Sequence, residues 1–249
     1  MLSPDNPDAR LILGIVSALF VLVMLYNTLM AGSRPYRRFV KFKSSWKRRN
    51  LMRKWLNQSF IFFGGLSVIA LLLSWQFIAP MLRAIDFLNA GALVNWSVVG
   101  GIALVLLFVP LTTVVVSKKG KMRLPRVIET AALLPRNRQE LKLGAALSLN
   151  AALVEEVLFR LALPAMLYGA TGNAIVAVVI SIVLYGALNA YKGFAGAVSS
   201  ALVGTLLMGS FVVSGVILVP IVIHALIDLR SLVFIPVVFG RVHTLKARW

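Results

Sequence analysis

Residues 11–30 of the chain read LILGIVSALFVLVMLYNTLM, an apolar run without a charged side chain. A membrane-spanning helix needs about 20 predominantly apolar residues to cross the hydrocarbon of a bilayer. Six further runs are also long and predominantly apolar. The seven predicted spans cover residues 10–31, 55–82, 94–116, 143–168, 174–190, 194–214 and 216–239. The sequence therefore predicts an all-α, polytopic integral membrane protein.

The overall composition agrees with this fold class. The 249 residues are 59% hydrophobic and 14% charged, whereas a soluble domain is about a quarter charged. The absence of cysteine excludes disulfides, zinc–thiolate sites and cysteine nucleophiles. Because no internal repeat or low-complexity linker divides the chain, we expect one integral membrane domain over 1–249. Within it we distinguish N-terminal spans and basic loops (1–128), a helical core (129–239) and a basic tail (240–249).

The formal net charge of +18 is concentrated in two segments between apolar runs. Ten of the 26 Lys and Arg lie in residues 34–54, and eight more lie in residues 118–142. Such loops face the cytoplasm under the positive-inside rule and attract anionic lipid head groups. We therefore expect a lipid partner rather than a nucleic acid. Seven spans then place the N-terminus outside and the C-terminus in the cytoplasm, in the cell's inner (plasma) membrane.

Residues 46–56 lie between the first two spans and alternate apolar side chains with cations. This pattern predicts a helix in the cytoplasmic interface, with its apolar side chains facing the lipid and its cations facing water. Anchoring of the following span is the favoured role, ahead of substrate capture.

Three acidic residues fall inside predicted spans, namely Glu155, Glu156 and Asp228. A charged side chain at the bilayer centre costs roughly 2.5–3.5 kcal/mol on insertion scales, so such residues usually line a polar cavity and serve a function. The sequence thus predicts a polar intramembrane cavity in the C-terminal half.

Two of these acids lie in the stretch Glu155-Glu156-Val157-Leu158-Phe159-Arg160. Glu156 and Arg160 are four residues apart on one helix face and are expected to pair. Glu155 points about 100° away and has no local cation. The two acids should therefore not ionise alike. We interpret Glu156 and Arg160 as a structural ion pair, and Glu155 as the group able to exchange a proton in general acid–base chemistry.

Two further pairs occur at helical spacing within predicted spans. Tyr185 and Asn189 share one face, but such residues also bond across membrane helices as packing contacts. His224 and Asp228 share a face in the last span. Because this face carries two groups that are costly in lipid, a functional interpretation is favoured for it.

Taken together, these residues resemble the CPBP family of intramembrane proteases, also called ABI or CAAX-protease-like proteins, which includes the Ras-converting CAAX endopeptidases. The family carries the motifs Glu-Glu-x-x-x-Arg, Phe-x-x-x-His and His-x-x-x-Asn/Asp on separate membrane helices. This chain has Glu155-Glu156-x-x-x-Arg160, Tyr185-x-x-x-Asn189 and His224-x-x-x-Asp228, and the resemblance covers about residues 129–229.

The resemblance implies catalytic roles for Glu155, Glu156, Asn189, His224 and Asp228, with Arg160 and Tyr185 in support. In the family, the first glutamate and the histidine of the second motif activate a water, and the third motif stabilises the oxyanion. Here Asn189 stands where the family has histidine, and Tyr185 replaces phenylalanine. An asparagine can hold a water by hydrogen bonds but cannot accept its proton.

Three functions follow from these patterns. The leading one is a glutamate-type intramembrane endopeptidase that acts on a membrane-associated peptide or lipidated protein and needs no cofactor. A metal held by Glu155, His224 and Asp228 is the less favoured variant. The alternative, based on Asn189, is a catalytically impaired relative that acts as a membrane adaptor, immunity or regulatory protein. A proton- or ion-coupled transporter is disfavoured because no inverted repeat is visible.

Overall fold

The computed structural model describes residues 2–4, 6–28, 33–85 and 134–240, and within these ranges the regular structure is entirely helical. The predicted third span, 94–116, and the basic tail from 241 onward lie outside the described residues. The helices are α1 (Ala9–Asn27), α2 (Ser33–Lys41), α3 (Ser45–Gln58), α4 (Gly64–Ala84), α7 (Arg138–Glu156), α8 (Leu163–Thr171), α9 (Ala174–Leu188), α10 (Phe194–Ser214), α11 (Leu218–Leu229) and α12 (Ile235–Gly240).

Single π-helical turns join pairs of these helices into longer continuous ones. Ser59–Phe63 joins α3 to α4, Val157–Ala162 joins α7 to α8, and Arg230–Phe234 joins α11 to α12. Such turns occur mostly as local insertions in α-helices and are frequent at functional sites. The middle one begins directly after Glu156 and contains Arg160.

Five of the described helices are long and apolar enough to cross a membrane. They are Ala9–Asn27, Ser45–Ala84, Ala174–Lys192, Phe194–Ser214 and Leu218–Val237, which match five of the predicted spans. The fourth predicted span, 143–168, lies within the continuous helix α7–α8. This helix is not among the five because its apolar stretch contains three charged residues, Glu155, Glu156 and Arg160.

Large apolar side chains cover the outside of the helices. Examples are Leu11, Ile61, Leu72 and Leu202, which are 68%, 72%, 67% and 67% exposed. Water would not favour so many exposed apolar groups on one chain, whereas lipid accommodates them. The protein is therefore an all-α polytopic membrane protein, as predicted.

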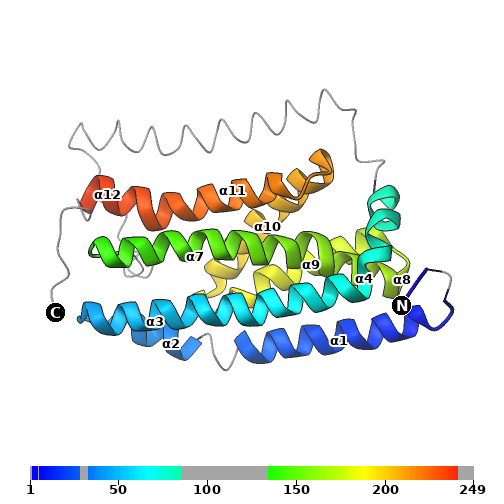
Figure 1. Ribbon diagram of the computed structural model, residues 1–249, viewed down its shortest axis with the longest axis horizontal. Helices are drawn as coiled ribbons and strands as arrows, with labels where there is room; N and C mark the ends of the chain where they lie inside the picture. The colour runs from blue at the N-terminus through cyan, green and yellow to red at the C-terminus, as the bar shows by residue number, and fades with distance from the viewer. Residues whose placement is uncertain (1, 5, 29–32, 86–133, 241–249) are drawn as a thin grey trace.

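The continuous helix α7–α8 lies at the centre of the described bundle. The α7 half packs between α3 and α11, and the α8 half contacts α1, α4 and α9. Figure 1 shows α1, α3–α4, α7 and α11–α12 running side by side along the long axis, with α9 and α10 behind them. Side chains near Glu156 can therefore meet several other helices.

Basic segments from distant parts of the chain meet at one end of this bundle. Helix α2 contacts both α3 and the short turn Ala190–Lys192, and α3 packs against α7. The Arg136 guanidinium Nη1 donates to the Phe42 carbonyl oxygen at 2.9 Å. The described parts of the predicted cytoplasmic connections therefore share one end, as a common compartment requires, although that compartment stays a prediction.

The interfacial helix predicted over 46–56 differs from the expectation in two respects. Helix α3 continues directly into α4 instead of forming a separate segment. Lys47, Arg53 and Lys54 are exposed as expected, but Arg48 and Arg49 are buried, with exposed fractions of 0% and 8%. The outward placement predicted for those two arginines was therefore wrong.

Arg48 is buried because an acidic partner lies on the facing helix. Its Nε donates to Glu140 Oε2 at 3.1 Å, and the Ser45 hydroxyl donates to Glu140 Oε1 at 2.8 Å. The Asn137 side chain accepts from the backbone N–H groups of Gln139 and Glu140, which fixes the start of α7. This ion pair joins two helices through residues that are 92 positions apart in the sequence. Helical spacing within one segment could therefore not have predicted it.

We expect Glu140→Gln to destabilise the fold, because the buried Arg48 charge would face a neutral amide. Removing one member of a buried ion pair typically costs about 3–5 kcal/mol. Thermal unfolding of the purified protein in detergent would measure the loss. Lys47→Gln, on the exposed side of α3, is the matched control and should leave the transition unchanged. Equal transitions for both variants would contradict a stabilising role for the pair.

Close contact between α9 and α10 depends on Gly186. A Cβ added there would lie 2.9 Å from the Ala201 Cβ and 3.1 Å from the Ala197 carbonyl oxygen. Small residues at such positions let membrane helices approach closely. By contrast, nothing lies within 4 Å of a Cβ built on Gly209 in the same helix pair.

Gly186→Ala should therefore lower the unfolding temperature, since the backbone of α10 would have to move. Gly209→Ala should leave it unchanged or raise it slightly, because alanine is the better helix former. Both can be compared in one thermal series. A Gly186→Ala variant as stable as Gly209→Ala would show that the helices do not pack this closely.

Candidate active site

A buried ion network surrounds Glu156 at the end of α7. Arg160 Nε donates to Glu156 Oε2 at 2.8 Å, which confirms the predicted pair. His224 Nδ1, from α11, lies 2.8 Å from Glu156 Oε1. Because a carboxylate can only accept, this ring nitrogen is the donor. The exposed fractions of Glu156, Arg160 and His224 are 0%, 0% and 4%.

The link from His224 to Glu156 was not predicted. The sequence pairs His224 with Asp228 one turn further along, and those two do share a face. Their closest atoms, His224 Nε2 and Asp228 Oδ2, are 3.7 Å apart, which is too long for a hydrogen bond. The stronger partner lies 68 residues away on another helix. No local spacing could have identified it.

Tyr185 supports the network from α9. The guanidinium carbon of Arg160 lies 4.8 Å from the centroid of its ring, a cation–π distance. The ring also meets Phe159 edge to face at 5.2 Å. Gly204 leaves space for it, since a Cβ there would lie 3.0 Å from Tyr185 Cδ1. Tyr185 therefore covers the arginine, and its ring is held by packing.

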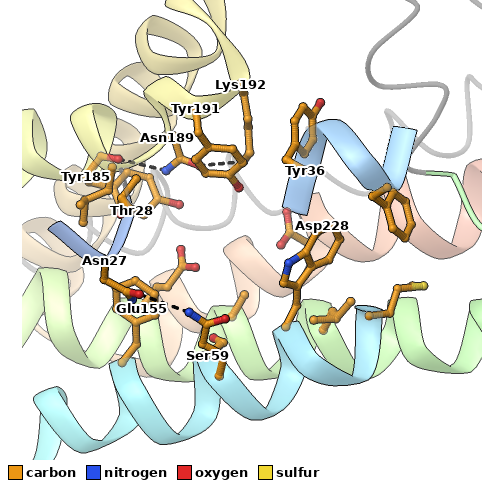
Figure 2. A pocket seen from close by; sticks show the side chains of 18 of the residues that line it. Asn27, Thr28, Tyr36, Ser59, Glu155, Tyr185, Asn189, Tyr191, Lys192 and Asp228 are labelled. Carbon is orange, nitrogen blue, oxygen red and sulfur yellow. Dashed lines mark hydrogen bonds between the residues drawn. The ribbon is translucent and has the colours of Figure 1, made fainter. Parts of the chain in front are cut away.

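A cavity of about 330 Å³ lies beside this network. Three charged residues line it, Glu155, Lys192 and Asp228, whereas Glu156, Arg160 and His224 do not belong to its lining. Figure 2 shows Glu155 and Lys192 projecting into it from opposite sides. The two adjacent glutamates are thus separated as predicted, one facing the cavity and the other held within the packed helices.

Most of the remaining lining is aromatic or aliphatic. Its larger apolar and aromatic members are Tyr36, Phe39, Trp55, Phe63, Phe159, Leu188, Tyr191 and Leu232. At the basic end, the rings of Tyr36 and Tyr191 meet edge to face at 5.5 Å. Helix α2 therefore forms part of the wall, a placement that its strongly basic sequence did not indicate.

Asn189 ends α9 at the edge of the cavity. Its Nδ2 donates to the Tyr185 carbonyl oxygen at 3.0 Å, and its Oδ1 accepts from Lys192 Nζ at 2.6 Å. Asn189 thus bonds the backbone of Tyr185, the residue predicted to share its helix face, and not the Tyr185 side chain. Both halves of the Asn189 amide have protein partners.

Sequence reasoning missed Lys192 as a site residue. It lies in the connection that follows the predicted span 174–190, and its side chain lines the cavity. The available signal was its spacing, three residues after Asn189. Two polar residues of the wall, Asn27 and Ser59, were also missed. Gln58 donates to Asn27 at 3.2 Å and Asn150 donates to Ser59 at 2.9 Å.

The three residues named above as possible metal ligands are Glu155, His224 and Asp228. Over the described ranges, no three His, Cys, Asp or Glu side chains form a group that could hold a metal ion. His224 has one ring nitrogen on Glu156 and the other facing Asp228. It would have to leave one of these partners to bind a metal.

Comparison with known proteins identifies one family. Residues 137–230 match the family described as type II CAAX prenyl endopeptidase Rce1-like. No curated protein and no solved structure matches the chain. The matched segment begins at the residue that caps α7 and includes all three motifs. The CPBP, or CAAX-protease-like, resemblance predicted from those motifs is thus confirmed over residues 137–230, the part of the chain that matches the family.

Proposed function

We propose that this protein is a glutamate-type intramembrane endopeptidase in which Glu155 activates a water. The observation that carries the proposal is the separation of the two glutamates. Glu156 is held by Arg160 and His224, while Glu155 lines the cavity and its carboxylate makes no hydrogen bond or ion pair within the described residues. A carboxylate so placed can accept a proton.

The proposed reaction is the hydrolysis of one peptide bond. The Glu155 carboxylate takes a proton from a water, and the resulting hydroxide adds to the carbonyl carbon of the substrate. The protonated Glu155 then gives its proton to the departing amine. The Glu156 network would position the end of α7 and keep a second negative charge away from the attacking oxygen.

The apolar and aromatic wall fits substrates that carry apolar groups, such as membrane-associated peptides or lipidated proteins. The exposed cations of α2 and α3 would hold anionic lipids at the same end of the bundle. We propose a location in the plasma membrane with this end in the cytoplasm and no nucleic-acid partner.

We propose that the reaction needs no metal. Elemental analysis of the purified protein tests this directly, because a stoichiometric metal that is lost in His224→Ala would overturn it.

The hydrogen bonds made by Asn189 favour a second function. Its amide is engaged by Tyr185 and Lys192, and an amide cannot accept the proton of a water. Loss of a general base or acid typically costs 10²- to 10⁴-fold in rate. The alternative is therefore an impaired relative that binds a peptide in the cavity and acts as a membrane adaptor, immunity or regulatory protein.

The decisive assay uses the purified protein in liposomes with membrane-anchored peptides that active relatives cleave. We expect the parent to cleave a peptide, and Glu155→Gln to lower kcat by about 10²- to 10⁴-fold. Asp8→Asn, an exposed acid outside the cavity, is the matched control and should behave as the parent.

The alternative function predicts a different pattern. In that case the parent cleaves nothing, while Asn189→His gains activity. If Glu155→Gln cleaves as well as an active parent, Glu155 is not the base.

A further inference from the structure

We propose that Lys192 is a catalytic residue that donates a hydrogen bond to the substrate carbonyl oxygen as it becomes an oxyanion. The inference rests on the peptidase function proposed above. It starts from the charges in the cavity wall. Within the described part of the chain, Lys192 is the one cation that lines the cavity, and it shares the wall with Glu155 and Asp228.

The backbone after α9 turns this lysine inward. Ala190–Lys192 forms a short 3₁₀ turn, and Gly193 follows at φ +92, a conformation that L side chains rarely adopt. A Cβ on Gly196 would lie 2.6 Å from the Lys192 Cβ. Glycine at 196 thus lets the stem of Lys192 pack against the first turn of α10, which aims its ammonium at the cavity.

The ammonium is held at a defined position. Its Nζ lies 2.6 Å from Asn189 Oδ1 and 5.4 Å from the ring centroid of Tyr191. Glu155 and Asp228 both act on it electrostatically. An ammonium has three donor hydrogens. Asn189 uses one of them and the Tyr191 side chain also engages the group, so the ammonium is fixed while one hydrogen remains for a ligand in the cavity.

The family resemblance assigns the oxyanion to the third motif, His224 and Asp228. Asp228 lines the cavity, but a carboxylate cannot donate to an oxyanion, and His224 is turned elsewhere. His224 donates to Glu156 and does not belong to the cavity lining. Its second ring nitrogen faces Asp228. A substrate carbonyl in the cavity would therefore meet the ammonium of Lys192 more directly than the imidazole.

The chemistry follows from this placement. Hydroxide formed by proton transfer to Glu155 adds to the carbonyl carbon, and the carbonyl π electrons move onto its oxygen. The Lys192 ammonium, fixed by Asn189, donates to that oxygen and stabilises the negative charge. When the C–N bond breaks, the electrons return to the carbonyl and Glu155 protonates the amine. A preformed cation in a cavity of low polarity is well suited to this task.

A double-mutant cycle tests the proposal, with kcat, KM and thermal unfolding measured for each variant. Lys192→Met should lower kcat by about 10²- to 10³-fold, the usual loss for one oxyanion donor, with a smaller effect on KM. Lys192→Arg should restore part of the rate. In an Asn189→His background, where the imidazole supplies a donor beside the cavity, Lys192→Met should cost less than about tenfold. Lys142→Met, an exposed lysine on α7, is the control and should match the parent.

The outcomes separate the two proposals. Lys192→Met with parental kcat, beside an inactive Glu155→Gln, overturns the role of Lys192 alone. Equal losses in the Asn189 and Asn189→His backgrounds, or a loss that tracks a lower unfolding temperature, also overturn it. A parent that cleaves no peptide overturns the peptidase function and this inference together.

Discussion

The hydrogen bonds that Glu156 accepts from Arg160 and His224 are the interaction on which the site depends. They stabilise a carboxylate that would otherwise be too costly to bury among membrane helices. They also connect the end of α7 with α11. Because successive side chains on a helix point about 100° apart, holding Glu156 within the packing directs Glu155 away from it and into the cavity. The difference between two adjacent, chemically identical residues thus arises from their neighbours.

The end of the bundle that carries the basic segments completes the cavity. The Arg48–Glu140 pair ties α3 to the start of α7, and α2 brings Tyr36 against Tyr191. The turn after α9 adds Lys192 to the wall. The basic segments that the sequence predicts as cytoplasmic loops therefore also contribute side chains to the protein interior. A positive-inside loop can serve both purposes, because the same cations that retain it in the cytoplasm can pair with buried acids.

The sequence predicted most of the helices because apolar runs are local features. It also predicted the Glu156–Arg160 pair, whose spacing of four residues is local too. It did not predict the contact of His224 with Glu156, the burial of Arg48 or the inward turn of Lys192. Each of these depends on which helix lies opposite, and that is set by packing between segments far apart in the chain. The catalytic roles of the site residues remain proposals.

The most direct test of the central claim is the chemical accessibility of position 155. The chain has no cysteine, so single cysteines can be introduced without further changes. Glu155→Cys should react with a small, water-soluble thiol reagent in the folded protein in liposomes. Ser181→Cys, at a fully buried position whose hydroxyl bonds the Phe159 carbonyl, should react only after denaturation. If Glu155→Cys is as protected as Ser181→Cys, the carboxylate does not face an accessible cavity, and the account is wrong.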